Sequence, residues 1–346
     1  MSGRSTPIAR LLRSEQAGLV AIILLMVVGL TLAAGSHVDP LSGRSVNDFF
    51  NSYTLIQTAT DASFFAIMAV GATIVIISGG IDLSVGSVYA LAGVTMGLLL
   101  RAHPGLGGAG AVLLSLLVCA GVGLGAGALN GGLVVGLRVH PFIITLGSMW
   151  ILRGIAFVTS KAESILLPES LTRFAKAPLG LGAALYPVPM LSMLVVAVLG
   201  SLYLGRTVMG RHVYALGGNP EASRFAGLRL GRIQVGVYLL AGLTAGLAAF
   251  LGASFYGSVS CGDATGYELY VIASAVVGGA RLSGGRGSAV NAMLGAVLIV
   301  LIRQSIRTLH LDQNYEWIII GSAIVIAVVL DQASARFTAR RLSERR

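Results

Sequence analysis

Long runs of apolar residues, separated by short polar or glycine-rich segments, dominate this sequence. A helix that spans a bilayer needs about 20 apolar residues. Such runs predict helices at about residues 17–34, 61–78, 85–100, 109–133, 142–159, 188–204, 233–255, 269–279, 289–302 and 317–330. The pattern therefore predicts an all-α polytopic membrane protein with about ten transmembrane helices.

Two of these runs, 269–279 and 289–302, are short for a bilayer and are flanked by glycine. They predict broken or re-entrant helices, which a bilayer tolerates only where the backbone is buried in protein or lines a cavity. The stretch 160–187 is interrupted by prolines and predicts a loop over the outer face.

The composition agrees with this assignment. The 346-residue chain is 55% hydrophobic and 11% charged, against roughly 25% charged residues in soluble domains. Its 47 glycines suit close contact between helices in lipid. Polar segments are too short to bury a core of their own, so we expect an N-terminal arm (1–16), one transmembrane domain (17–331) and a basic tail (332–346).

The net charge of +10 has its basic residues at the chain ends and in the loops. If both termini are cytoplasmic, most of these residues lie on the inner side, as the positive-inside rule requires. Orientation in the bilayer, with the tail at the anionic inner leaflet, explains the charge better than binding to nucleic acid does.

The segment 78–87 interrupts the apolar sequence with two glycines, a carboxylate and hydroxyl groups. Gly79 and Gly80 can adopt backbone angles closed to other residues, so they predict a turn. Asp82 can then cap the next helix, with Ser84 as the competing cap. The alternative is functional, because an ionisable group in a membrane is costly and marks a pathway or a partner contact.

The inner segment 205–232 carries the signal for a short helix. Asn219 is a good N-cap, Pro220 fits the first helical position, and Glu221 favours the positive end of the helix. Gly227 would end this helix. An exposed amphipathic helix of this kind suits docking into a groove on a soluble partner, or else lies on the lipid surface.

The segment 266–288 contains Glu268 between Tyr267 and Tyr270. Tyrosines gather at the bilayer interface, which favours an interfacial acid. Alternatively, Glu268 neutralises Arg153, since a lone intramembrane arginine needs a partner or water.

The sequence contains no Gly-x-x-x-x-Gly-Lys-Ser/Thr loop and no catalytic or metal-binding motif. We therefore expect no catalytic residue, metal or cofactor in this chain. Cys119 and Cys261 should lie at different depths, so we expect no disulfide. The segments 79–87 and 278–285 are alike, which indicates either two related halves or similar turns arising by chance.

Four segments, 78–87, 141–147, 214–219 and 277–287, resemble the ribose/xylose/arabinose-type permeases, whose superfamily also includes branched-chain amino-acid permeases. The resemblance spans nearly the whole chain. It implies a permease subunit of a bacterial ABC importer in the inner membrane, carrying a monosaccharide. Family members often have Asp where this chain has Tyr270.

The resemblance also implies partners. These are an ABC ATPase subunit that binds ATP and Mg, an extracytoplasmic sugar-binding protein and a second permease copy. Glu221 and Ala222, followed by Gly227, resemble the coupling motif of ABC importers, with Ser223 in place of its second alanine.

Four polar residues are candidates to line the sugar pathway: Ser87, Asn130, Thr145 and Ser148. Each is equally explained by hydrogen bonding between helices. Other readings of the whole chain are an ABC permease for an amino acid, nucleoside or autoinducer, an ion-driven carrier, and a membrane scaffold that moves no solute.

Overall fold

The computed structural model describes residues 15–38, 43–178, 186–322, 325 and 329. Its helices are α2 (Glu15–Ala33), α3 (Ser52–Ile77), α4 (Val85–Ala102), α5 (Gly108–Leu137), α6 (Pro141–Ser160), α7 (Glu169–Ala175), α8 (Pro187–Arg206), α9 (Val208–Gly218), α10 (Pro220–Phe225), α11 (Leu230–Tyr256), α12 (Tyr267–Val277) and α13 (Ala289–Thr308). Two small antiparallel sheets pair β1 (Ser36–Val38) with β2 (Ser45–Asn47) and β3 (Ile165–Leu166) with β4 (Ser258–Val259).

Eight helices in the described part of the chain are long and apolar enough to cross a membrane, namely all but α7, α9, α10 and α12. This confirms the all-α polytopic prediction. The helix α12 has only 11 residues, about 16 Å at 1.5 Å per residue, so it cannot span a bilayer alone. Residues 315–322 are helical. Six residues of the last predicted run (323, 324, 326–328 and 330), the first 14 residues of the predicted N-terminal arm and the predicted basic tail lie outside the described residues.

The structure corrects three boundaries. The predicted short run at 289–302 is the 20-residue α13, because its polar C-terminal turns continue the helix. The helix α3 begins nine residues before the predicted start, at Ser52, where the Asn51 side chain accepts a hydrogen bond from the Thr54 amide. The predicted outer loop at 160–187 contains α7 and β3.

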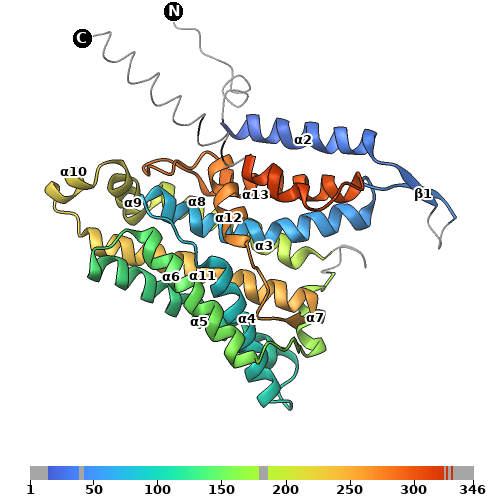
Figure 1. Ribbon diagram of the computed structural model, residues 1–346, viewed down its shortest axis with the longest axis horizontal. Coiled ribbons are helices and arrows are strands. Elements are labelled where there is room, and N and C mark those ends of the chain that lie inside the picture. The colour runs from blue at the N-terminus through green and yellow to red at the C-terminus, as the bar shows by residue number, and fades with distance from the viewer. Residues whose placement is uncertain (1–14, 39–42, 179–185, 323–324, 326–328, 330–346) are drawn as a thin grey trace, which may run out of the picture.

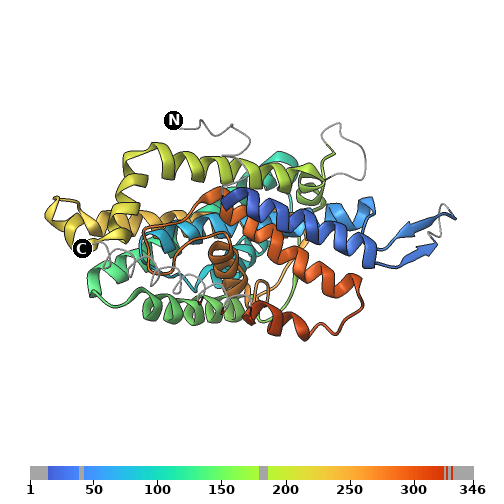
Figure 2. The ribbon, with the colours of Figure 1, turned by 90° about the horizontal axis from the view of Figure 1, so that it is seen from above.

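The helix α3 forms the centre of the bundle. It packs against α8, α11, α12 and α13, and all of its residues from Ala62 to Ile77 are buried. The helix α2 lies at the periphery along α13, as Figures 1 and 2 show. The molecule has two ends: α9 and α10 form one, and β1, β2 and α7 lie toward the other (Figure 1).

Glycines let α5 and α11 approach closely. A Cβ atom at Gly123 would lie 2.2 Å from the Gly242 carbonyl oxygen, and one at Gly127 would lie 2.3 Å from that of Tyr238. Spacings of four residues place Gly123, Gly127 and Gly131 on one face of α5. Backbone contact therefore replaces side-chain interdigitation here, as in other membrane helix pairs built on small residues.

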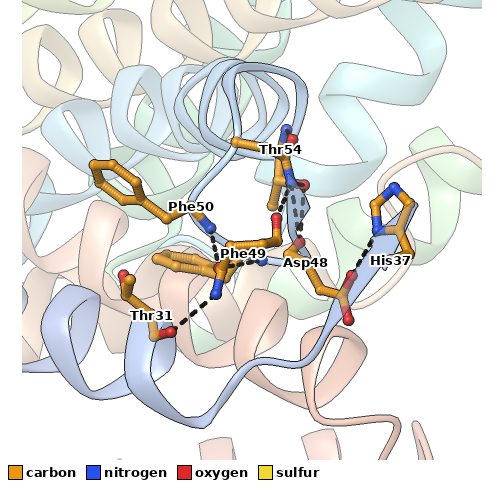
Figure 3. Close-up of polar contacts among 8 residues, drawn as sticks. Thr31, His37, Asp48, Phe49, Phe50 and Thr54 are labelled. Carbon is orange, nitrogen blue, oxygen red and sulfur yellow. Dashed lines mark hydrogen bonds and ion pairs between the residues drawn. The ribbon is translucent and has the colours of Figure 1, made fainter. Parts of the chain in front are cut away.

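The N-terminal hairpin is fastened to the bundle by side chains (Figure 3). Asn47 donates to the Thr31 carbonyl at 3.0 Å and accepts from the amides of Phe49 and Phe50. The His37 imidazole and the Asp48 carboxylate lie 2.6 Å apart on the exposed side. The end of α2, the hairpin and the start of α3 thus form one connected unit.

Replacing Gly242 by alanine should destabilise the protein. The new Cβ atom would lie 2.0 Å from the Gly123 carbonyl oxygen, and overpacking of this kind costs about 1–3 kcal/mol. The measurement is thermal unfolding in detergent. Gly236→Ala is the matched control on the same helix, since its Cβ atom would meet nothing within 4 Å. Equal melting temperatures for the two variants would refute the assigned contact.

Candidate functional site

The chain breaks between α3 and α4 in a turn stabilised by its own backbone. The Gly79 amide donates to the Ile76 carbonyl at 2.9 Å, and the Gly80 amide donates to that of Val75 at 3.0 Å. Gly79 has a φ of +85°, a conformation that suits glycine. This is the paired hydrogen bonding of a glycine-terminated helix, so the predicted turn is confirmed.

Asp82 is buried just before α4. Its Oδ1 accepts hydrogen bonds from the Ser84 amide at 2.8 Å and from the Ser84 hydroxyl at 2.6 Å. Ser84 occupies the N-cap position, although its side chain makes no capping hydrogen bond. The prediction that Asp82 caps α4 is therefore wrong. Ser84 takes the N-cap position, and the Asp82 carboxylate accepts hydrogen bonds from Ser84 itself.

Three other helices contact this break through polar side chains. Asn130 of α5 donates to the Ser84 hydroxyl at 2.8 Å. Thr145 of α6 donates to the Ile81 carbonyl at 3.2 Å, and Tyr238 of α11 donates to the same carbonyl at 3.3 Å. The candidates Asp82, Ser84, Asn130 and Thr145 thus come together in one network. Sequence reasoning missed Tyr238, whose only signal is a tyrosine within an apolar run.

A second break, between α12 and α13, repeats the first. Gly279 has a φ of +87° and donates to the Val276 carbonyl at 2.8 Å, while Ala280 donates to that of Ala275 at 2.9 Å. Gly79 and Gly80 make the same pair of hydrogen bonds at the end of α3 that Gly279 and Ala280 make at the end of α12. The sequence likeness of the two segments therefore corresponds to the same turn geometry.

The two breaks touch each other and α9. The Gly285 amide donates to the Ile77 carbonyl at 2.8 Å, which joins the second break to the end of α3. A Cβ atom at Gly217 of α9 would lie 1.7 Å from the same Ile77 oxygen. Tyr214 of α9 also donates to the Gly287 carbonyl at 2.8 Å. The helix α9 is therefore in backbone contact with both interrupted helix pairs.

The helix α10 continues from α9 and projects from the bundle (Figure 1). The Asn219 side chain accepts from the Ala222 amide at 2.9 Å, Pro220 stands at the first position and Glu221 lies in the first turn. Gly227, with a φ of +80°, ends the segment. These local predictions are confirmed. Phe225, 91% exposed, presents an apolar ring on this surface.

Two pathway candidates stand apart from the network at the break. Ser87 is buried on α4, and its hydroxyl has no hydrogen-bond partner in the described part of the chain. Ser148 is buried on α6, one turn after Thr145.

Arg153 and Glu268 attract each other electrostatically, but in the described part of the chain they form no salt bridge within 4 Å. Arg153 Nη1 donates to the Cys261 carbonyl at 2.8 Å and to the Asp263 carbonyl at 2.6 Å. One carboxylate oxygen of Glu268 is buried and has no hydrogen-bond partner among the residues that the structure describes. Carbonyl groups of the loop after β4 therefore satisfy Arg153. Burial raises the pKa of the Asp263 carboxyl, while the Ser260 amide and Arg153 act to lower it.

A charged cluster near the end opposite α10 was missed by sequence reasoning. Asp61 accepts from the Tyr256 hydroxyl at 2.6 Å and lies 3.9 Å from Arg307. Arg303 lies 2.7 Å from Glu316, which also accepts from the Tyr270 hydroxyl. Tyr270, at the position where the resemblance led us to expect Asp, thus donates a hydrogen bond to an acidic residue from another segment. Both cysteines are free, as expected.

Interrupted helices held together by buried polar groups, on a scaffold of apolar spans, are typical of membrane transporters. The chain belongs to the family described as branched-chain amino acid transport system / permease component, whose model matches residues 54–329. It is a multi-pass inner-membrane protein of this permease class.

Relatives with known names are also import permease proteins. The chain is 33% identical over 318 residues to the ribose import permease protein RbsC of Escherichia coli strain K12, covering 92% of this chain and 93% of that protein. It is 32% identical over 317 residues to the fructose import permease protein FrcC of Rhizobium meliloti, covering 90% and 85%. It is 33% identical over 326 residues to the autoinducer 2 import system permease protein LsrC of Yersinia enterocolitica, covering 90% and 88%. No solved structure matches the chain.

Replacing Asp82 by alanine should lower the free energy of unfolding by about 1–3 kcal/mol, because two buried donors of Ser84 lose their acceptor. Asp82→Asn keeps an oxygen at this position and should unfold close to the wild type. Thermal unfolding in detergent measures both. A loss of stability that is equal in the two variants would show that the negative charge, rather than the acceptor geometry, stabilises the turn.

Proposed function

We propose that this chain is the permease subunit of an ABC importer for a monosaccharide. The observation that supports this most is the position of α9, which carries the exposed α10 at one end and touches both helix breaks with its backbone. A partner that moves α10 would therefore act directly on the interrupted helices.

The first step is docking of an ATPase subunit on α10. The segment Asn219–Gly227 presents exposed Phe225 and Arg224 around a helix that is fixed at both ends by its own caps. Apolar anchors on a short preformed helix suit insertion into a groove. The ATPase subunit would bind ATP and Mg; the permease chain would supply the docking surface.

The second step is transmission to the membrane domain. The close approach of Gly217 to Ile77 and Gly285 leaves no free space between α9 and the two turns. Displacement of α9 would shift the ends of α3 and α12 as near-rigid bodies. Movement of one helix set against another changes access between the two sides of a membrane.

The third element is the end opposite α10, where an extracytoplasmic binding protein would deliver the sugar. The hairpin β1–β2 and the β3–β4 pair lie toward this end (Figure 1). A second permease copy would complete the pathway, as the family resemblance implies. The relatives that import ribose, fructose, allose and arabinose favour a monosaccharide as the cargo.

Replacing Phe225 by glutamate should reduce co-purification of the ATPase subunit at least about tenfold, because an apolar anchor becomes a charge in the docking groove. Leu166→Glu is the matched control. Leu166 is 84% exposed, is also outside the apolar spans, and lies on β3 toward the other end. Equal loss in both variants would indicate general destabilisation, and normal recovery with Phe225→Glu would refute docking at α10.

The transport assignment is tested in proteoliposomes that contain the permease, its ATPase and its binding protein. ATP enclosed within the liposomes should drive uptake of at least one labelled sugar among D-ribose, D-fructose, D-allose and L-arabinose. An uncoupler should leave this uptake unchanged. Collapse with the uncoupler would identify an ion-driven carrier. Uptake of autoinducer 2 but of none of these sugars would reassign the cargo.

A further inference from the structure

A cavity of about 350 Å³ lies between α4, the end of α11 and the loop that leads to α12. This volume is at the lower end of the range for sites that hold small molecules. Its polar lining comes from Tyr89, Tyr256, Ser258, Asp263 and Tyr267. None of these residues belongs to the network around the α3–α4 break.

The lining contains one hydroxyl that the described part of the protein does not use, that of Tyr89. Tyr89 is only 8% exposed, and its hydroxyl has no hydrogen-bond partner within the described part of the chain. Gly252 makes space for this group, since a Cβ atom there would lie 2.0 Å from the Tyr89 oxygen. The arrangement thus maintains an unpaired donor at the cavity.

Asp263 adds an acceptor. Its Oδ2 accepts from the Ser260 amide at 2.9 Å, which fixes the carboxylate within its own loop. The Arg153 guanidinium holds the same loop through the carbonyl of Asp263 and so offsets the negative charge nearby. Gly86 lies on α4 one turn before Tyr89, and the buried carboxylate oxygen of Glu268, from α12, lies against it.

Aromatic rings supply the apolar part of the wall. The rings of Tyr89 and Tyr267 have centroids 6.2 Å apart at an interplanar angle of 56°, so they form two sides of a corner. Flat ring faces suit the C–H surfaces of a sugar, whereas carboxylate and phenol groups suit its hydroxyls.

We infer that the cavity between Tyr89, Tyr256, Asp263 and Tyr267 is a monosaccharide-binding subsite within the permease itself. This inference rests on the proposed function and specifies where the sugar binds at the end away from α10. The Tyr89 hydroxyl and Asp263 hydrogen-bond the sugar hydroxyls, and the Tyr89 and Tyr267 rings contact its carbon skeleton.

The first experiment measures protection of a cysteine placed on the cavity wall. Ser258→Cys is introduced into the full permease in lipid nanodiscs, without the binding protein, and its reaction with a small methanethiosulfonate is followed. Wild type is the background control, because Cys119 and Cys261 are both buried. Millimolar D-ribose, D-fructose, D-allose or L-arabinose should slow the reaction at least about threefold, and the disaccharide sucrose should not.

Tyr89→Phe in the same background should abolish this protection, because it removes only the hydroxyl. Tyr186→Phe is the matched control: Tyr186 packs edge-on against Phe255 and does not line the cavity. Loss of protection in both variants, or in neither, would overturn the assigned subsite.

A second measurement needs no new cysteine. A ligand that binds only the folded state raises its melting temperature. A transported sugar should raise the melting temperature of wild type and Tyr186→Phe, and should not raise that of Tyr89→Phe. A sugar effect of equal size in all three proteins would place binding elsewhere.

The uptake assay separates the two proposals. If the reconstituted wild type imports one of the four sugars but that sugar gives neither protection nor a thermal shift, the subsite is wrong and the proposed function stands. If none of the four is imported, the cargo assignment fails, and protection by none of them then overturns the subsite as well.

Discussion

The structure depends on the rule that backbone polar groups in a bilayer must find partners within the protein. A continuous helix meets this rule by itself, whereas an interrupted one does not. Both breaks use the same glycine-terminated turn, in which backbone amides of the turn donate hydrogen bonds to carbonyl groups of the preceding helix. The free Ile81 carbonyl is then satisfied by Thr145 and Tyr238 from two other helices.

Glycine makes these solutions compatible with tight packing. At Gly217, Gly242 and Gly278 a side chain would collide with backbone atoms of a neighbouring helix or turn. The glycines on α5 and α11 set the separation of two long spans, while Gly217 sets the contact between α9 and the breaks. The same residue type thus stabilises the scaffold and positions the segment that carries α10.

Features encoded by a few adjacent residues could be predicted from the sequence. The spans follow from hydrophobic runs, and the turn at Gly79 and the cap at Asn219 follow from local chemistry. The capping residue of α4 could not be assigned, because the number of residues between the turn and the helix depends on contacts with α5 and α6. The partners of Arg153 were missed for a related reason: charge alone suggests Glu268, but the carbonyl groups of a distant loop lie closer.

The geometry of α9 has a mechanical consequence. Its contacts with Ile77 and Gly285 are made through backbone atoms at close range, and such atoms cannot yield by changing rotamer. A shift of α9 must therefore either carry both turns with it or break hydrogen bonds that a bilayer would leave unpaired. Because the second course is costly in lipid, the first is favoured. The interrupted helices, rather than the continuous ones, are thus the elements that a force applied at α10 reaches first.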